Sequence, residues 1–174
     1  MAVRSTSGSV IAGRSTKEAI REAAIRLFSS KGFEQTSLRE VADAVREIRR
    51  GKGMLLVEGD PDCRSAGSFF KNPIVGLEML AGIAVAAGVE ESNVPHWPAG
   101  DGKMKVPAAW LLEQAGFVKG YGVGSAGIST RHTLALTNRG GATFADVERL
   151  QDEIVRGVRE KFGIALEREP VLVG

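Results

Sequence analysis

The chain has 174 residues, of which 43% are hydrophobic and 25% are charged, an ordinary balance for a globular protein. Its formal net charge is +2, and its single cysteine, Cys63, has no partner for an internal disulfide. No apolar run approaches the ~20 residues that span a bilayer, and the N-terminus lacks the apolar stretch of a secretory signal. We therefore expect a cytoplasmic chain with no membrane segment.

Two helices are predicted near the N-terminus. Residues 1–14 are rich in Ser and Gly and are expected to form a mobile leader. Ser15 and Glu18 have the spacing of a capping box, and Gly32 is placed to end the helix that they open. Its apolar stripe is Ile20, Ala23, Ala24, Leu27 and Phe28. A second capping box, at residues 37–40, opens a helix that continues as a basic stretch to Gly51.

The remaining elements alternate without a repeating unit. We predict a short strand at 54–57, helices at 77–87 and 106–115, and a strand at 132–138. The long connection 89–105 and the glycine-rich bend 120–127 separate them. Thr143 opens the longest helix, and residues 164–173 read as a final strand. The pattern predicts the α+β class: a small mixed sheet with packed helices, preceded by the N-terminal helical pair.

The helical pair resembles the start of the tetracycline-repressor type of DNA-binding domain. The matching positions lie within residues 13–45 and include Leu27, Phe28, Gly32 and Phe33. Residues 1–50, which include this region, are modestly basic, with ten Lys and Arg against six Asp and Glu. In that family a turn and a recognition helix follow, but the sequence after Val45 does not continue the pattern. Base readout needs an element in a groove, so we expect no specific DNA binding.

The segment 64–73, Arg-Ser-Ala-Gly-Ser-Phe-Phe-Lys-Asn-Pro, has the composition of a ligand-contacting turn. Its small residues allow the backbone to approach a ligand closely, and Ser68 and Asn72 offer short polar groups. Pro73 disfavours helix at Asn72 and directs the chain into an extended conformation. The residues alone predict a binding turn and do not identify the ligand.

This segment and four other blocks resemble UDP-N-acetylenolpyruvoylglucosamine reductase, the flavoenzyme that forms UDP-N-acetylmuramate for peptidoglycan. The other blocks are residues 49–53, 94–98, 108–117 and 169–174, in the family's order. They match only its C-terminal, substrate-binding domain. The resemblance implies three regions: the leader 1–14, a truncated helix-turn-helix at 15–45, and a UDP-sugar substrate-binding domain at 46–174.

The resemblance also implies roles for six residues. Ser68 would be the catalytic proton donor to the reduced enolpyruvyl group, and Glu169 would assist it. Lys52 and Asn72 would hold the substrate diphosphate, Trp97 would lie beside the nucleotide, and His132 would contact the uridine end. Four of these residues also have purely structural interpretations. Ser68 could be a turn serine and Glu169 an exposed acid. Trp97 could be a loop anchor and His132 a strand histidine. For Ser68 and Glu169 to cooperate, the end of the chain must return beside Ser68.

The family enzyme uses FAD and NADPH on UDP-N-acetylglucosamine enolpyruvate, and its flavin module precedes the matched domain. Residues 1–45 are too few to form that module, so we expect this chain to bind no cofactor and to be inactive alone. A flavin-binding domain on another chain is one candidate partner, and the sequence does not decide whether such a domain is supplied. Without a Cys/His cluster we expect no metal site. Two alternatives remain: a transcription regulator with a UDP-sugar sensing domain, and a non-functional fusion.

Overall fold

The computed structural model describes residues 16–172, and the expected leader and Ser15 lie outside this range. The chain divides into two compact units, Met1–Ile48 and Arg49–Gly174. We refer to them as the N-terminal unit and the C-terminal unit. No helix in the described range is long and apolar enough to cross a bilayer.

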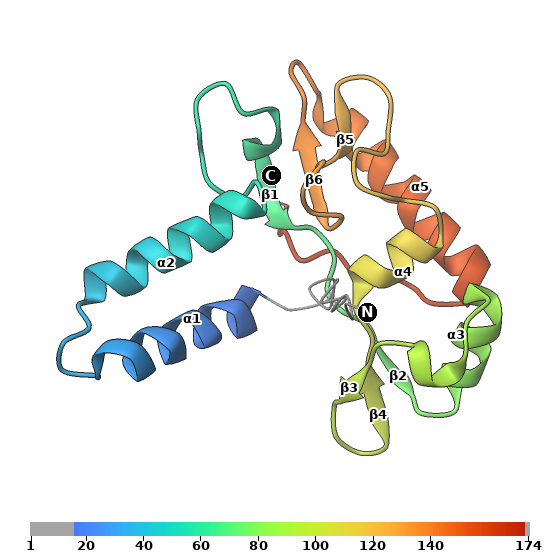
Figure 1. Ribbon diagram of the computed structural model, residues 1–174. Coiled ribbons are helices and arrows are strands. Elements are labelled where there is room, and N and C mark those ends of the chain that lie inside the picture. The colour runs from blue at the N-terminus through green and yellow to red at the C-terminus, as the bar shows by residue number, and fades with distance from the viewer. Residues whose placement is uncertain (1–15, 173–174) are drawn as a thin grey trace, which may run out of the picture. The chain divides into compact units, whose positions relative to one another are not determined.

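The N-terminal unit contains α1 (Thr16–Lys31) and most of α2 (Leu38–Gly51) (Figure 1). Gly32 ends α1 with a φ of 85°, and its N–H donates to the carbonyl of Phe28. Ser37 and Glu40 form the predicted capping box, because each side chain accepts a hydrogen bond from the other residue's backbone N–H. The predicted ends of both helices are therefore confirmed where they can be observed.

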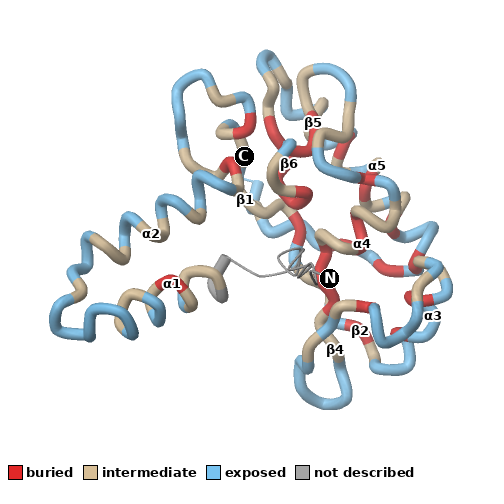
Figure 2. Tube along the Cα trace, in the orientation of Figure 1, coloured by how far each residue is buried: buried red, intermediate tan, exposed pale blue. Residues whose placement is uncertain are grey.

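The N-terminal unit has a small hydrophobic core. Ala23 is the buried hydrophobic residue among its described side chains, and Figure 2 shows the pair mostly in exposed and intermediate colours. The rings of Phe28 and Phe33 lie 5.1 Å apart, and Lys31 forms an ion pair with Glu40. Phe33 nevertheless keeps 76% of its surface exposed. The helical pair buries little apolar surface of its own.

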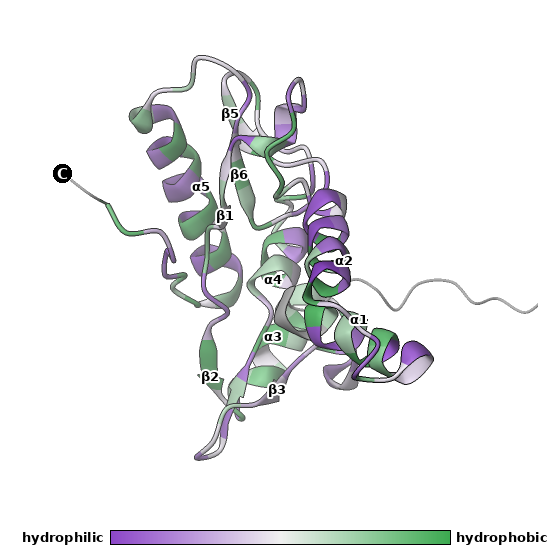
Figure 3. Cartoon of the chain, turned by 90° about the vertical axis from the view of Figure 1, so that its left-hand side faces the viewer, coloured by the Kyte–Doolittle hydropathy of each residue, from purple (hydrophilic) through white to green (hydrophobic). Residues whose placement is uncertain are grey.

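The C-terminal unit has two three-stranded antiparallel sheets, in the orders β1-β6-β5 and β2-β4-β3. They lie toward opposite ends of this unit, with α4 between them in both views (Figures 1 and 3). The elements in chain order are η1 (Pro61–Cys63), β1 (Ser65–Ser68), β2 (Ile74–Gly76), α3 (Met79–Ala87), η2 (Glu91–Asn93), β3 (Trp97–Pro98), β4 (Lys103–Lys105), α4 (Ala108–Gln114), β5 (Ala126–Ile128), β6 (Ala135–Asn138) and α5 (Phe144–Phe162).

Helix α5 organises the core of the C-terminal unit. Thr143 opens this helix as predicted and forms a capping box with Asp146, and one face of the helix is buried while the other is polar (Figure 3). Gly157 allows the ring of Phe117 to pack against this helix, since a Cβ there would lie 2.6 Å from the ring. The buried side chains of α5 are Leu150, Ile154, Val158 and Phe162. They join side chains of α3, α4 and both sheets in one hydrophobic cluster.

The α+β class and the N-terminal helical pair are confirmed, but four details differ from the prediction. The strands form two separate antiparallel sheets rather than one mixed sheet. Residues 54–57 are not a strand, and the connection 89–105 contains the β3–β4 hairpin. In the described part of the predicted final strand, residues 164–172, the sheet pairing is limited to an isolated bridge between Phe70 and Arg168. Sheet pairing depends on contacts that are remote in sequence, which local pattern cannot specify.

Candidate substrate-binding site

Ser68 is the last residue of β1, not part of a turn as predicted. It lies opposite Ala135 of β6, and the register shifts between Ser65 and Ser68. Gly67 has a φ of 85° at this irregularity, a conformation that favours glycine. A Cβ on Gly67 would meet nothing within 4 Å, so the backbone conformation is what requires glycine here. The bulged strand end therefore sets the direction of the half-buried Ser68 side chain.

The imidazole of His132 lies beside the Ser68 hydroxyl. The Ser68 Oγ and His132 Nε2 atoms are 3.4 Å apart. Burial lowers the pKa of His132 from 6.5 to about 4, and the positive charges of Lys52 and Lys119 add to the effect. The ring is therefore neutral at pH 7. The resemblance implied a contact with the uridine end of the substrate, whereas the contact found within the chain is with Ser68.

Lys52 and Lys119 make the surroundings of His132 positive. Lys52 follows the end of α2 and is half-buried, and burial lowers its pKa. Lys119 lies in the loop after α4 and acts on His132 through its charge. Lys52 was expected from the sequence at this site and Lys119 was not. Nothing in the local pattern of Lys119 distinguished it from any other exposed lysine.

Asp62 holds the turn that carries His132. Asp62 is 4% exposed. Its carboxylate accepts two hydrogen bonds from Thr130, one from the backbone N–H (3.0 Å) and one from the side-chain hydroxyl (2.6 Å). Burial opposes the ionisation of Asp62, but the bonds from Thr130 and Ser129 and the charge of Arg131 outweigh it and lower the pKa. Arg131 also donates to Asp60 at 2.6 Å. This network fixes residues 129–132 against η1.

The end of the chain returns beside Ser68, as the proposed cooperation with Glu169 requires. The N–H of Glu169 donates to the carbonyl of Phe69 at 2.8 Å, and the N–H of Lys71 donates to the carbonyl of Glu167 at 2.9 Å. Glu169 is exposed, and its backbone is bonded to the residue that follows Ser68. The expected proximity of the two segments is confirmed, and the role of the carboxylate stays a prediction.

Asn72 and Trp97 lie apart from the Ser68–His132 contact. The Oδ1 of Asn72 accepts the N–H of Ala108 at 2.9 Å, where α4 begins. Its amide nitrogen is the donor that it could offer to a diphosphate. Trp97 is in β3 on the other sheet, paired with Lys105 and half-buried. The structure therefore groups Ser68, His132 and Lys52, with the backbone of Glu169 adjacent, and does not group Trp97 with them.

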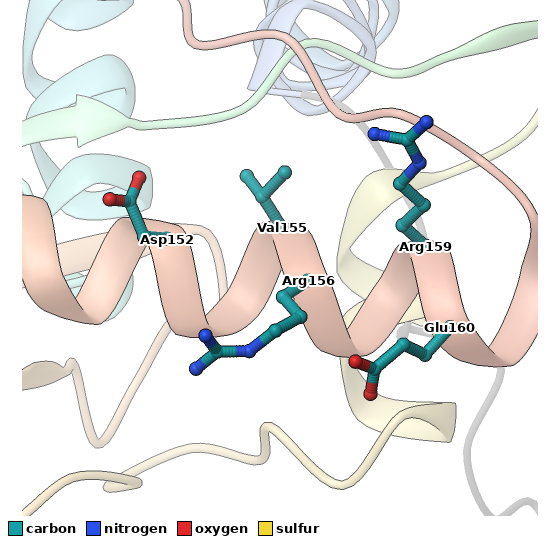
Figure 4. A pocket seen from close by; sticks show the side chains of 5 residues that line it. All are labelled: Asp152, Val155, Arg156, Arg159 and Glu160. Carbon is teal, nitrogen blue, oxygen red and sulfur yellow. The ribbon is translucent and has the colours of Figure 1, made fainter.

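Two cavities of the C-terminal unit lie away from this group. One, of about 410 Å³, is lined by five residues of α5 (Figure 4). Asp152, Val155 and Arg159 extend from one side of that helix, and Arg156 and Glu160 from another (Figure 4). The second, of about 690 Å³, lies between the glycine-rich bend and α5. Neither is lined by a residue predicted for the site.

The glycine-rich bend does not fit a flavin pyrophosphate. Arg139 donates hydrogen bonds to the carbonyl oxygens of Gly120, Tyr121 and Gly122, and to that of Ile128. A phosphate loop presents backbone N–H groups at a helix N-terminus, whereas this bend presents carbonyls to a guanidinium and leads into a strand. Within residues 16–172 no group of three His, Cys, Asp or Glu side chains is placed to hold a metal ion.

The fold and the grouped residues define an α+β domain with a basic, half-buried site around a serine. The family model for the UDP-N-acetylenolpyruvoylglucosamine reductase C-terminal domain matches residues 60–173. The chain belongs to this family. A model for bacterial regulatory proteins of the tetR family matches residues 20–46.

Curated relatives support the same assignment. The chain is 54% identical over 145 residues to a UDP-N-acetylenolpyruvoylglucosamine reductase of Thermobifida fusca, which covers 81% of this chain and 40% of that protein. It is 49% identical over 155 residues to one of Streptomyces coelicolor, covering 86% and 40%. With one of Mycolicibacterium gilvum the identity is 48% over 165 residues, covering 94% and 46%. The chain thus spans less than half the length of these relatives.

The transcription-regulator alternative is not favoured by these findings. The similarity to the tetR family covers 27 residues, and it ends inside α2. The residues that follow this helix, 52–60, are non-helical, and the next element is the three-residue η1. Within the described range, no third helix follows α2 where a recognition helix would stand.

Proposed function

We propose that the chain supplies the substrate-binding and proton-donating part of a reductase acting on UDP-N-acetylglucosamine enolpyruvate. The observation that carries the proposal is the family match over residues 60–173, within which Ser68 and His132 lie in contact. Lys52, which precedes the matched range, acts on His132 through its charge. The family's reductases use FAD and NADPH, which supply the hydride. The roles proposed for this chain are therefore substrate binding and proton donation, and hydride transfer is left to the cofactors.

In this proposal Ser68 holds the proton that the reduced substrate carbon receives. A hydroxyl is a weak acid in water, so the site must stabilise the alkoxide left behind. The positive charges of Lys52 and Lys119, which act on the neighbouring His132, would also stabilise a negative charge on the Ser68 oxygen. Glu169, whose backbone is bonded to Phe69, would orient or polarise the enolpyruvyl group.

The remaining proposed contacts concern the nucleotide. Lys52 supplies an ammonium and Asn72 an amide N–H to the diphosphate. Trp97 packs beside the nucleotide, and His132 contacts its uridine end. We further propose that residues 46–174 form the substrate-binding domain. Its proposed partner is a flavin-binding domain in another chain. The proposed location is the cytoplasm.

Thermal unfolding with and without UDP-N-acetylmuramate, the product, tests the proposal. A ligand at about 100 times its Kd adds roughly 2.7 kcal/mol to the unfolding free energy. For a chain of this size we expect a rise of roughly 5–10 °C in Tm. N-acetylglucosamine alone should give no shift, and Lys52→Met should abolish the shift with the product. A cooperative transition that the product does not move would contradict the proposal.

A further inference from the structure

We infer that His132 is a positioning residue that holds the Ser68 hydroxyl and donates an N–H hydrogen bond to its oxygen as that oxygen loses its proton. The inference rests on the proposed function, since an alkoxide at Ser68 arises only if this serine is a proton donor. It assigns His132 a role within the chain, in addition to any contact with the nucleotide.

The geometry brings the two side chains together from separate elements. Ser68 ends β1, and His132 lies in the turn before β6, the strand that pairs with β1. Their Oγ and Nε2 atoms are 3.4 Å apart, within reach of a hydrogen bond that would tighten as charge develops on oxygen. The neighbouring N–H of Phe69 is already bonded to Leu134 at 2.8 Å, which fixes the two backbones at this point.

The turn that carries His132 is held rigidly. The N–H of His132 donates to the Ser129 hydroxyl at 3.3 Å, and the carbonyl of His132 accepts the N–H of Ala135 at 3.0 Å. Ser129 itself is fully buried. Asp62 holds the adjacent Thr130 through two hydrogen bonds. The imidazole is therefore placed in advance, which is what makes a donor effective in stabilising a developing charge.

The charged surroundings favour a donor over a base. The groups that act on the ring are Lys52, from the segment after α2, and Lys119, from the loop after α4, while Asp62 and Arg131 lie in the network beneath the turn. Together with burial, the two lysines keep the imidazole neutral at pH 7. A neutral imidazole has one N–H and is a weak base here, so it is poorly suited to remove the serine proton.

The proposed step conserves protons and electrons. The Ser68 O–H bond breaks, its proton bonds to the carbanionic substrate carbon, and Oγ keeps the electron pair. The Nε2–H bond of His132 stays intact and shares its hydrogen with Oγ. Solvent then returns a proton to Oγ, and His132 ends in the state in which it began.

A cysteine in place of Ser68 makes the effect measurable without substrate or flavin. The thiol and thiolate of Ser68→Cys stand in for the hydroxyl and alkoxide, and Cys63→Ser removes the other thiol. In this background His132→Phe should raise the pKa of the introduced thiol by about half to one unit, because the thiolate loses a hydrogen-bond donor. The pKa is measured from the absorbance of the thiolate as a function of pH. His132→Gln keeps an N–H and should return the pKa most of the way. The imidazole of His96 contacts the Val94 carbonyl. As a control, His96→Phe should leave the pKa of the introduced thiol unchanged.

The tautomer of His132 provides a second test, made on the unaltered chain. Nitrogen chemical shifts should show the hydrogen on Nε2, and Ser68→Ala should shift that nitrogen. An unchanged thiol pKa in His132→Phe, or a hydrogen on Nδ1, would overturn the inference. Product binding is measured separately on the unaltered chain, so failure of this inference is distinguishable from failure of the proposed function. If His132→Phe does not fold, the tautomer decides.

Discussion

The backbone N–H of Glu169 donates to the carbonyl oxygen of Phe69 at 2.8 Å, joining residues that are a hundred positions apart. This bond places the end of the chain beside the strand that ends at Ser68. Together with the bond from Lys71 to Glu167 it forms the single bridge that replaces the predicted final strand. The proposed site therefore depends on a short pairing rather than on a full strand.

We predict that the Glu169 backbone contributes to stability independently of its carboxylate. Glu169→Pro removes the N–H and should lower the unfolding free energy by about 1–2 kcal/mol. Glu169→Gln keeps the N–H, and because the residue is exposed its stability should change by less than about 0.5 kcal/mol. Urea unfolding measures both. Equal stability of the two variants would show that the bond does not hold the segment.

A second prediction concerns Asn72, whose oxygen accepts the N–H of the fully buried Ala108. Asn72→Ala should cost about 1–3 kcal/mol, because it leaves a buried donor without its partner. Asn72→Asp keeps an acceptor at that position and serves as the matched control. If Asn72→Ala unfolds at the same urea concentration as the parent chain, this contact has no structural importance.

The third prediction is a pH dependence of stability. His132 has a pKa of about 4 in the folded chain and 6.5 as its ordinary value, so protonation favours unfolding. Stability from this residue is complete above about pH 6.5 and is lost as the pH falls toward 4. Allowing for partial exposure, the loss is on the order of 1–2 kcal/mol. His132→Gln should flatten the profile over this window, and an unaltered slope would refute the assignment.

Local pattern predicted the elements whose ends are set by neighbouring residues. The capping box at Ser37, the helix start at Thr143 and the helix stop at Gly32 are determined within a few positions, and all three are observed. The strand expected at 54–57 has apolar residues but no sheet partner in the structure. Its apolar residues satisfied the pattern without supplying the pairing that a strand needs.

The candidate site was predictable only in part for the same reason. The resemblance pointed to Ser68 and Lys52 by motif. The contact between Ser68 and His132 depends on the pairing of β1 with β6, and the influence of Lys119 depends on the packing of the loop after α4. The acceptor role of Asn72 required the position of α4, which no feature of residues 64–73 encodes.

The fourth prediction addresses nucleic acid. The basic helices should bind DNA weakly and without sequence preference, so fluorescence anisotropy with random duplexes should show affinity falling steeply between about 50 and 200 mM salt. Arg49→Gln with Arg50→Gln should weaken this binding uniformly across sequences. Retention of one particular sequence at high salt would instead require base readout.

The central claim is tested most directly by grafting Arg49–Gly174 onto the Thermobifida fusca relative in place of its own matching domain. The measurement is NADPH-dependent reduction of UDP-N-acetylglucosamine enolpyruvate. The graft should form product, and Ser68→Ala in the graft should lower the rate by roughly 10²–10⁴-fold while the product still binds. A graft whose rate is unaffected by Ser68→Ala, or a folded, flavin-loaded graft that forms no product, would contradict the account.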